Sequence, residues 1–105
     1  MKEDTGAERR NFARERTHIS VEIRKDMKKV PGTIEYLSFG GAFVSAPRTF
    51  LRDSLVQIKF DVPGELQSFQ GSAKVIWVKK DKAMGVQFLD LPTSERVKLE
   101  KFLNR

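Results

Sequence analysis

Residues 56–64, with the sequence VQIKFDVPG, decide the fold of this chain. Apolar and polar residues alternate up to Val62, which is typical of a strand with one buried face. Pro63-Gly64 then predicts an abrupt turn, and a second strand-like run extends from Leu66 to Val78. Together these segments predict an antiparallel hairpin, with Ala73 and Val75 on one face of its second strand.

Further strand patterns lie on both sides of this hairpin. Ile19, Val21 and Ile23 alternate with polar residues. Later in the chain, Gly40-Gly41 interrupts an extended segment, because paired glycines allow a sharp bend or bulge. The predicted strands outside the hairpin cover residues 19–23, 32–38, 42–44 and 84–89. The predicted turns and connections cover residues 26–31, 47–53 and 79–82.

Six short antiparallel strands in a small chain favour a closed barrel, because closure removes the exposed edges of the sheet. A single helix is expected after the strands. Pro92 and Thr93 mark its start, with Thr93 as the cap and Glu95 in the first turn. The fold class is therefore mostly β, a six-stranded antiparallel β-barrel with a C-terminal α-helix. The apolar stripe of this helix is formed by Val97, Leu99, Phe102 and Leu103.

The chain of 105 residues is long enough for one domain with a modest core. Residues 1–16 have no hydrophobic period and are predicted to form a flexible N-terminal arm, whereas residues 17–105 form the barrel and helix. No apolar run approaches the roughly 18 residues that cross a bilayer, and the start of the chain does not resemble a signal peptide. We therefore expect a cytoplasmic protein without membrane insertion.

The composition contains few of the residues that usually carry out catalysis. The chain has no cysteine and a single histidine, His18, which argues against thiolate chemistry, disulfides and a metal site. No Ser, His and Asp pattern suggests a nucleophile and its base, and His18 is expected to be structural. The sequence thus predicts neither an enzyme nor a bound cofactor.

The net charge of +6 and the pI near 9.8 favour acidic partners, which include nucleotides, nucleic acids and anionic membrane surfaces. Positive and negative residues are interleaved, as in residues 22–26, and this pattern is typical of an ordinary solvated surface. A polynucleotide partner is therefore not expected. A nucleic-acid-binding small β-barrel is kept as a third hypothesis, which a steep salt dependence of DNA or RNA binding would support.

Two short motifs suggest a binding function. Arginines at positions 10 and 14 flank Asn-Phe-Ala in the arm, and Ser38-Phe39-Gly40-Gly41 follows a predicted strand. An arginine presents a fixed fork of N–H donors, which fits a phosphate or the O6/N7 edge of guanine. The polar arm could close over a ligand held against the barrel and become ordered only then.

The order of these motifs resembles the PilZ domains of bacteria. The resemblance rests on residues 8–14 (ERRNFAR), residues 38–44 (SFGGAFV) and residues 84–88 (MGVQF), and it covers roughly residues 8–103. It implies a six-stranded β-barrel with a C-terminal helix that binds the second messenger cyclic di-GMP, often as a stacked pair of molecules.

The resemblance also implies which residues bind the ligand. Arg10 and Arg14 match the arginine motif, which in relatives grips phosphates and guanine edges, and Arg9 would add a further guanidinium. Ser38 and Gly41 match the second motif, which lies on the barrel surface and contacts a guanine. The candidate ligand-binding residues are Arg9, Arg10, Arg14, Tyr36, Ser38, Gly40 and Gly41.

Tyr36 departs from the family pattern, which has Asp or Asn at this position. A carboxylate can accept two hydrogen bonds from guanine, whereas a phenol offers one oxygen, and the loss of a bidentate contact costs about 1–3 kcal/mol. Tyr36 either recovers part of this loss by stacking on a base or fills the guanine site. Glu35 is not expected to replace the missing carboxylate, because neighbouring strand residues face opposite sides unless a bulge intervenes.

Two main functions follow. The first is a cyclic di-GMP receptor or adaptor, whose arm closes on the ligand and changes the surface that an unidentified bacterial protein partner meets. The alternative is a degenerate PilZ-like adaptor that binds a protein but no nucleotide. The sequence leaves open whether the domain is a monomer or a dimer. Trp77 is predicted to pack in the barrel rather than to serve as a stacking platform.

Overall fold

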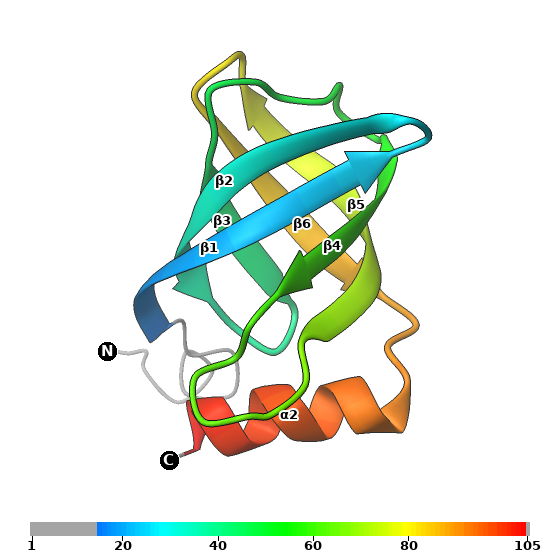
Figure 1. Cartoon of the computed structure of the whole chain (residues 1–105). Helices are drawn as coiled ribbons and strands as arrows, with labels where there is room; N and C mark the ends of the chain where they lie inside the picture. Colours follow the sequence, from blue (N-terminus) through cyan, green and yellow to red (C-terminus); the bar gives the residue numbers. More distant parts are fainter. Residues whose placement is uncertain (1–14, 105) are drawn as a thin grey trace, which may run out of the picture.

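The computed structural model describes residues 15–104. Six strands close into a barrel in the order β1-β2-β3-β6-β5-β4, and each neighbouring pair is antiparallel (Figure 1). The predicted six-stranded antiparallel barrel with a C-terminal helix is confirmed. The elements are β1 (Glu15–Lys25), β2 (Lys28–Leu37), β3 (Gly41–Ser45), β4 (Leu55–Phe60), β5 (Phe69–Lys79), β6 (Ala83–Leu89) and α2 (Thr93–Leu103).

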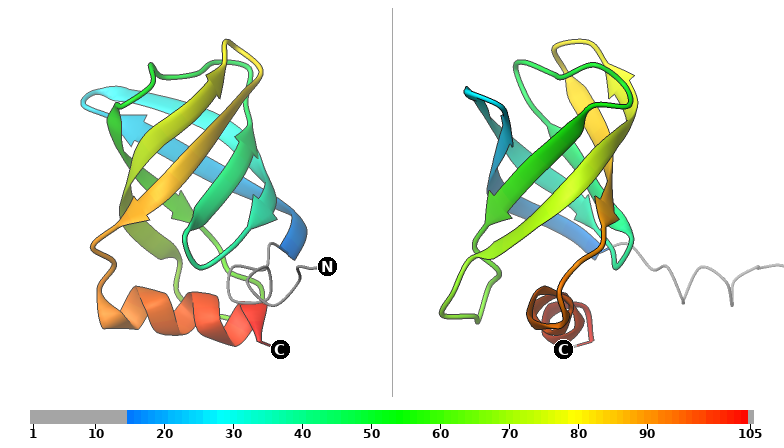
Figure 2. Two further views of the ribbon diagram at one scale, coloured as in Figure 1. Left: turned by 180° about the vertical axis from the view of Figure 1, so that it is seen from behind. Right: turned by 90° about the vertical axis from the view of Figure 1, so that its right-hand side faces the viewer.

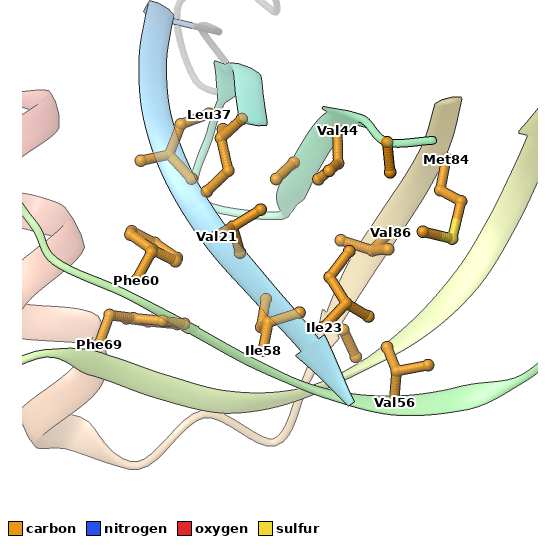
Figure 3. Packing of buried hydrophobic residues seen from close by; sticks show 14 of the residues in the cluster. Val21, Ile23, Leu37, Val44, Val56, Ile58, Phe60, Phe69, Met84 and Val86 are labelled. Carbon is orange, nitrogen blue, oxygen red and sulfur yellow. The ribbon is translucent and has the colours of Figure 1, made fainter. Parts of the chain in front are cut away.

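The pairing of β1 with β4 closes the barrel. Val21 lies opposite Phe60, and Ile23 lies opposite Ile58. All four side chains are buried, so the alternation that predicted these strands marks the side facing the interior. Apolar side chains from every strand fill that interior (Figure 3). The largest fully buried side chains are those of Phe69, Ile23, Ile34, Leu37, Met84 and Leu99.

The first hairpin is tighter than the sequence predicted. The turn between β1 and β2 consists of Asp26 and Met27, and Asp26 has a positive φ of 56°. Pro31 was assigned to this turn, but it lies within β2 opposite Glu22. The strand tolerates proline there because pairing with β3 begins only at Thr33, so β2 is still an edge at Pro31.

The hairpin of β4 and β5 is confirmed, although its connection is longer than two residues. Leu66 was predicted to start the second strand, but its side chain is fully exposed and β5 begins at Phe69. Gly64 adopts a φ of 90°, and the Ser68 hydroxyl donates a hydrogen bond to an Asp61 carboxylate oxygen at 2.6 Å. The chain therefore forms a polar loop before strand pairing resumes.

Helix α2 lies across one end of the barrel (Figures 1 and 2). Leu99 and Phe102 are buried in the barrel core, and Leu103 is partly buried against it. The predicted cap is wrong, because the helix begins after Pro92 and no side chain caps its first turn. Within residues 15–104, no helix is long and apolar enough to cross a membrane.

A polar contact ties α2 to the start of β5. A Glu95 carboxylate oxygen accepts a hydrogen bond from the backbone N–H of Gln70 at 2.9 Å. The Lys98 ammonium lies 3.1 Å from the same carboxylate group and also donates to the carbonyl oxygen of Ser68 at 2.9 Å. Both charged side chains are largely buried, with 13% and 12% of the Glu95 and Lys98 side chains exposed. The contact therefore ties the helix both to Gln70 at the start of β5 and to Ser68, the last residue of the loop before it.

This contact makes helix docking depend on pH. Burial raises the pKa of Glu95, but hydrogen bonds from the Gln70 N–H, Lys98 and Ser94 outweigh it, so the pKa lies below its ordinary value of 4.5. The unfolded chain then binds more protons than the folded chain in this acidic range. The stability that ionised Glu95 contributes is complete above pH 4.5 and is lost as the pH falls through the lowered pKa.

We expect Glu95→Gln to lower the free energy of unfolding by about 1–3 kcal/mol at neutral pH, because a charge-assisted contact is lost. The difference from the unaltered chain should shrink as the pH falls below 4.5 and Glu95 takes up a proton. Urea unfolding at neutral pH and at a series of acidic pH values measures this effect. Glu100→Gln, on the exposed side of α2, is the control, and an equal loss in both variants would contradict the assignment.

Candidate functional site

Residues 38–41 form the chain reversal between β2 and β3. The backbone N–H of Ser38 donates to the carbonyl oxygen of Gly41 at 2.9 Å. The Ser38 hydroxyl oxygen accepts hydrogen bonds from the N–H groups of Gly40 and Gly41 at 3.2 and 3.3 Å. The sequence predicted a bend or bulge here, but these bonds close a turn and the chain reverses. Ser38 therefore shapes the turn on which the motif lies.

The two glycines of the turn meet different constraints. A Cβ atom on Gly41 would lie 2.0 Å from the carbonyl oxygen of Val86 in β6, so the close approach of the two backbones requires glycine there. A Cβ atom on Gly40 would meet nothing within 4 Å. Gly40 instead accepts a hydrogen bond from the N–H of Phe88 at 2.9 Å. Gly41 thus fixes the position of the turn against β6, and Gly40 forms its open surface.

A β-bulge sets the direction of Tyr36. Ile34 pairs with Val44 and Tyr36 pairs with the next residue of β3, Phe43, so Glu35 is an extra residue in β2. Buried Ile34 and Leu37 flank two partly exposed side chains, those of Glu35 and Tyr36. The exception stated for the expected alternation therefore applies, because the bulge turns both Glu35 and Tyr36 outward.

Glu35 nevertheless does not take the place of the missing carboxylate. Its carboxylate oxygen accepts a hydrogen bond from the hydroxyl of Ser45 at 2.7 Å. Ser45 lies at the far end of β3 from Gly41. The carboxylate is thus turned away from the Ser38–Gly41 turn.

A second bulge turns Trp77 outward. Val75 pairs with Val86 and Trp77 pairs with Gly85, so Ile76 is the extra residue in β5. Trp77 is 46% exposed, which shows that the predicted packing inside the barrel is wrong. Its ring instead packs on Phe43 across Gly85, with ring centroids 5.5 Å apart. Alternation alone placed Trp77 on the same side as Val75, and the inserted residue reverses that relation.

Three aromatic residues consequently form one row on the outside of the barrel. Tyr36 in β2 lies opposite Phe43 in β3, Phe43 lies opposite Gly85 in β6, and Gly85 lies opposite Trp77 in β5. The rings of Tyr36 and Phe43 meet edge to face with centroids 6.3 Å apart. Gly85 has no side chain, so Phe43 and Trp77 touch above it. We call Tyr36, Phe43 and Trp77 the aromatic row.

An exterior cleft of about 300 Å³ lies between the aromatic row and the β2–β3 turn. Four of the predicted site residues line it, namely Tyr36, Ser38, Gly40 and Gly41. The sequence did not identify its other lining residues as site residues. Those in β5 and β6 reach the cleft only through the strand order of the barrel, which cannot be read from the chain. The other lining residues are Ala42, Phe43, Ile76, Gly85, Val86 and Gln87.

Arg9, Arg10 and Arg14 lie outside the described residues. The described chain begins at Glu15, which pairs with Leu37, and Arg16 pairs with Tyr36. β1 therefore starts beside the end of β2 that leads into the Ser38–Gly41 turn (Figure 2). It also starts two residues before the boundary drawn from the sequence, because Glu15 and Arg16 already pair with β2.

The cleft has no charged lining residue among those described, so its own surface offers ring faces, backbone groups and amide or hydroxyl groups. His18 is exposed on β1 and does not line the cleft. Within residues 15–104, no three His, Asp or Glu side chains gather in a way that could hold a metal ion. This arrangement can hold a flat, neutral part of a ligand. An anionic part of the same ligand would need cations from outside these lining residues.

Fold and site together define a small closed β-barrel with a cleft on its outer surface. A family model described as the PilZ domain matches residues 8–105. The chain therefore belongs to the PilZ domain family. The predicted resemblance is thus confirmed. No curated protein matches the chain.

Solved structures share this fold at low sequence identity. The inhibitor of motility MotI/DgrA of Bacillus subtilis matches with a TM-score of 0.75 and 17% identity over 92% of this chain and 51% of MotI/DgrA. The chain thus spans about half the length of that protein. The PilZ domain of YcgR from Escherichia coli, solved with c-di-GMP, matches with a TM-score of 0.73 and 15% identity over 91% of this chain and 90% of that domain.

A third structure is the PilZ domain of CeSA from a cellulose-synthesizing bacterium. It matches with a TM-score of 0.67 and 22% identity over 87% of this chain and 95% of that domain. At these identities the likeness establishes the common barrel fold, and the site must be argued from the residues of this chain.

We expect Gly41→Ala to destabilise the domain by about 1–3 kcal/mol or more, because a methyl group would collide with the backbone of β6. Gly40→Ala should change stability by less than about 0.5 kcal/mol, since its Cβ atom meets open space. Thermal and urea unfolding of both variants measures the difference. Equal stability of the two variants would contradict the close approach of β3 and β6 at this turn.

Proposed function

We propose that this PilZ domain is a receptor for cyclic di-GMP. One observation carries the proposal: the cleft gathers Tyr36, Ser38, Gly40 and Gly41 beside the strand that directly follows Arg14. The cleft suits a guanine base, because its walls offer aromatic faces for stacking and polar groups for the edge of the base. Family membership and the c-di-GMP complex of the YcgR PilZ domain support the same ligand.

The phosphates of the ligand require cations, and the residues of 15–104 that line the cleft supply none. In this proposal Arg10 and Arg14 bind the phosphates and a guanine edge through their guanidinium forks, and Arg9 adds a third positive charge. The pairing of Glu15 with Leu37 supports this assignment, because it joins the arginine-bearing segment to the barrel next to the cleft. The overall positive charge of the chain also favours a dianionic ligand.

Binding would give a signal by changing the surface of the domain. We propose that the ligand draws residues 9–14 against the cleft, so that a bacterial protein partner meets a different surface in the bound state. The energy for this change comes from the new charge-assisted hydrogen bonds, which must exceed the entropy lost when the segment becomes ordered. The domain would then act as a cytoplasmic adaptor rather than as a catalyst.

A second candidate is an adaptor that binds a protein without a nucleotide. Tyr36 favours this function, because its ring lines the cleft at the position where the family pattern has Asp or Asn. The exposed side chains of Ile76 and Trp77 beside the cleft would extend the apolar surface offered to such a partner.

We expect the purified chain to bind cyclic di-GMP with a heat signal in calorimetry. Arg14→Ala should weaken this binding at least about tenfold, because a guanidinium contact to phosphate is lost. Lys79→Ala, an exposed cation at the end of β5, should change it less than about twofold. Equal losses in the two variants would indicate diffuse electrostatics, and no heat at hundreds of micromolar ligand would exclude the receptor.

A pull-down experiment distinguishes the receptor from the adaptor that binds no nucleotide. We expect capture of partner proteins by the receptor to depend on added cyclic di-GMP and to be lost in the Arg10→Ala, Arg14→Ala double variant. Quantitative pull-down with and without the nucleotide measures both effects. Capture that is unchanged by the nucleotide and by the double variant would favour the second candidate.

A further inference from the structure

Gln87 is a polar residue of the cleft to which the family motifs assign no role. In β6, Met84 and Val86 are buried inside the barrel, so Gly85 and Gln87 face outward. Gln87 pairs with Gly41 of the β2–β3 turn, which places it at the end of the cleft next to the second motif. Its side chain is exposed and has no hydrogen-bond partner among the residues that the structure describes.

The side-chain polar groups of Ser38 and Glu35 are already engaged. The Ser38 hydroxyl accepts hydrogen bonds from two backbone N–H groups of the turn. It also donates one to the carbonyl oxygen of Gly41 at 3.3 Å. The carboxylate of Glu35 is bonded to Ser45, outside the cleft. Gln87 therefore offers an amide whose oxygen and N–H groups are all available to a ligand.

The aromatic row supplies what a planar base requires in addition. Tyr36 and Phe43 line the cleft on the side away from the turn, and Ile76 adds an aliphatic surface. A purine has apolar faces that stack on such side chains and a polar edge that must be paired. In this cleft the faces of the base meet the aromatic row and its polar edge meets Gln87, because the aromatic row and Gln87 lie at different positions along the strands.

We infer that Gln87 reads the Watson–Crick edge of a guanine held in this cleft and so replaces the Asp or Asn that Tyr36 displaces. This inference rests on the proposed function and adds a base-binding residue to it. The amide oxygen accepts a hydrogen bond from N1–H or N2–H of guanine, and the amide N–H donates to O6. Tyr36 then contributes its ring rather than its hydroxyl to the base.

An amide differs from a carboxylate in the bases that it accepts. The same amide can donate to N1 of adenine and accept from its N6–H group, whereas a carboxylate only accepts hydrogen bonds and leaves N1 unpaired. The native Gln87 should therefore discriminate weakly between guanine and adenine. A glutamate at this position should favour guanine strongly, because it matches the two donors at N1 and N2.

Calorimetry of the full chain with cyclic di-GMP and cyclic di-AMP tests this assignment. We expect Gln87→Leu to weaken cyclic di-GMP binding about tenfold to a hundredfold. Gln87→Glu should keep that binding within about threefold and raise the preference over cyclic di-AMP by at least about tenfold. Gln70→Leu is the matched control, because Gln70 is an exposed glutamine on β5 that lies outside the cleft.

A second measurement uses the unaltered protein. We expect the side-chain amide resonances of Gln87 to shift on titration with cyclic di-GMP while those of Gln70 stay in place. Binding by the native chain together with an unchanged affinity of Gln87→Leu would overturn this inference and leave the receptor intact. Absence of binding by the native chain would overturn the receptor and this inference with it.

Discussion

The antiparallel pairing of β1 with β4 is the constraint on which the rest of the structure depends. It joins segments that are far apart in the chain and removes both open edges of the sheet. Val21, Ile23, Ile58 and Phe60 meet across this seam and are all buried, so closing the barrel also fills its interior. α2 then covers one end of the barrel, held by buried apolar side chains and by the contact of Glu95 with Lys98.

A barrel this small has its interior filled by side chains, and its binding surface must therefore lie outside. Bulges at Glu35 and Ile76 create that surface, because each inserts one residue and turns the next side chain from the core to the exterior. Tyr36 and Trp77 acquire their exposed positions in this way. Gly85 keeps the space between Phe43 and Trp77 free of a side chain, so the outer face of four strands becomes one aromatic surface.

The strand pattern could be predicted from the sequence, since burial of one face leaves a strict alternation that β1 and β4 follow. Three of the errors share one cause. Pro31, Leu66 and Trp77 were assigned from local pattern. Strand pairing instead decides whether a proline is tolerated and where a strand resumes. It also decides where an extra residue is inserted, and this insertion moves the following side chain to the other face of the strand. Four of the ten described residues that line the cleft were predicted from the sequence, because they lie in or next to the compact motif of Ser38 and Gly41. Phe43 and Gln87 lie in segments that carry the family resemblance, but the sequence did not single them out as site residues, because only the strand order shows that both line the cleft.

By itself the sequence determined the fold class, the family and the residues of the turn, because alternation, glycine chemistry and motif order are properties of neighbouring residues. Only the tertiary structure decided that β3 lies between β2 and β6 and that Gly41 touches the backbone of β6. It also decided that Gln87 lies at the end of the cleft nearest the turn. The physical reason is that register and bulges arise when strands distant in the chain pair, and each shift of one residue exchanges the inner and outer faces of a strand.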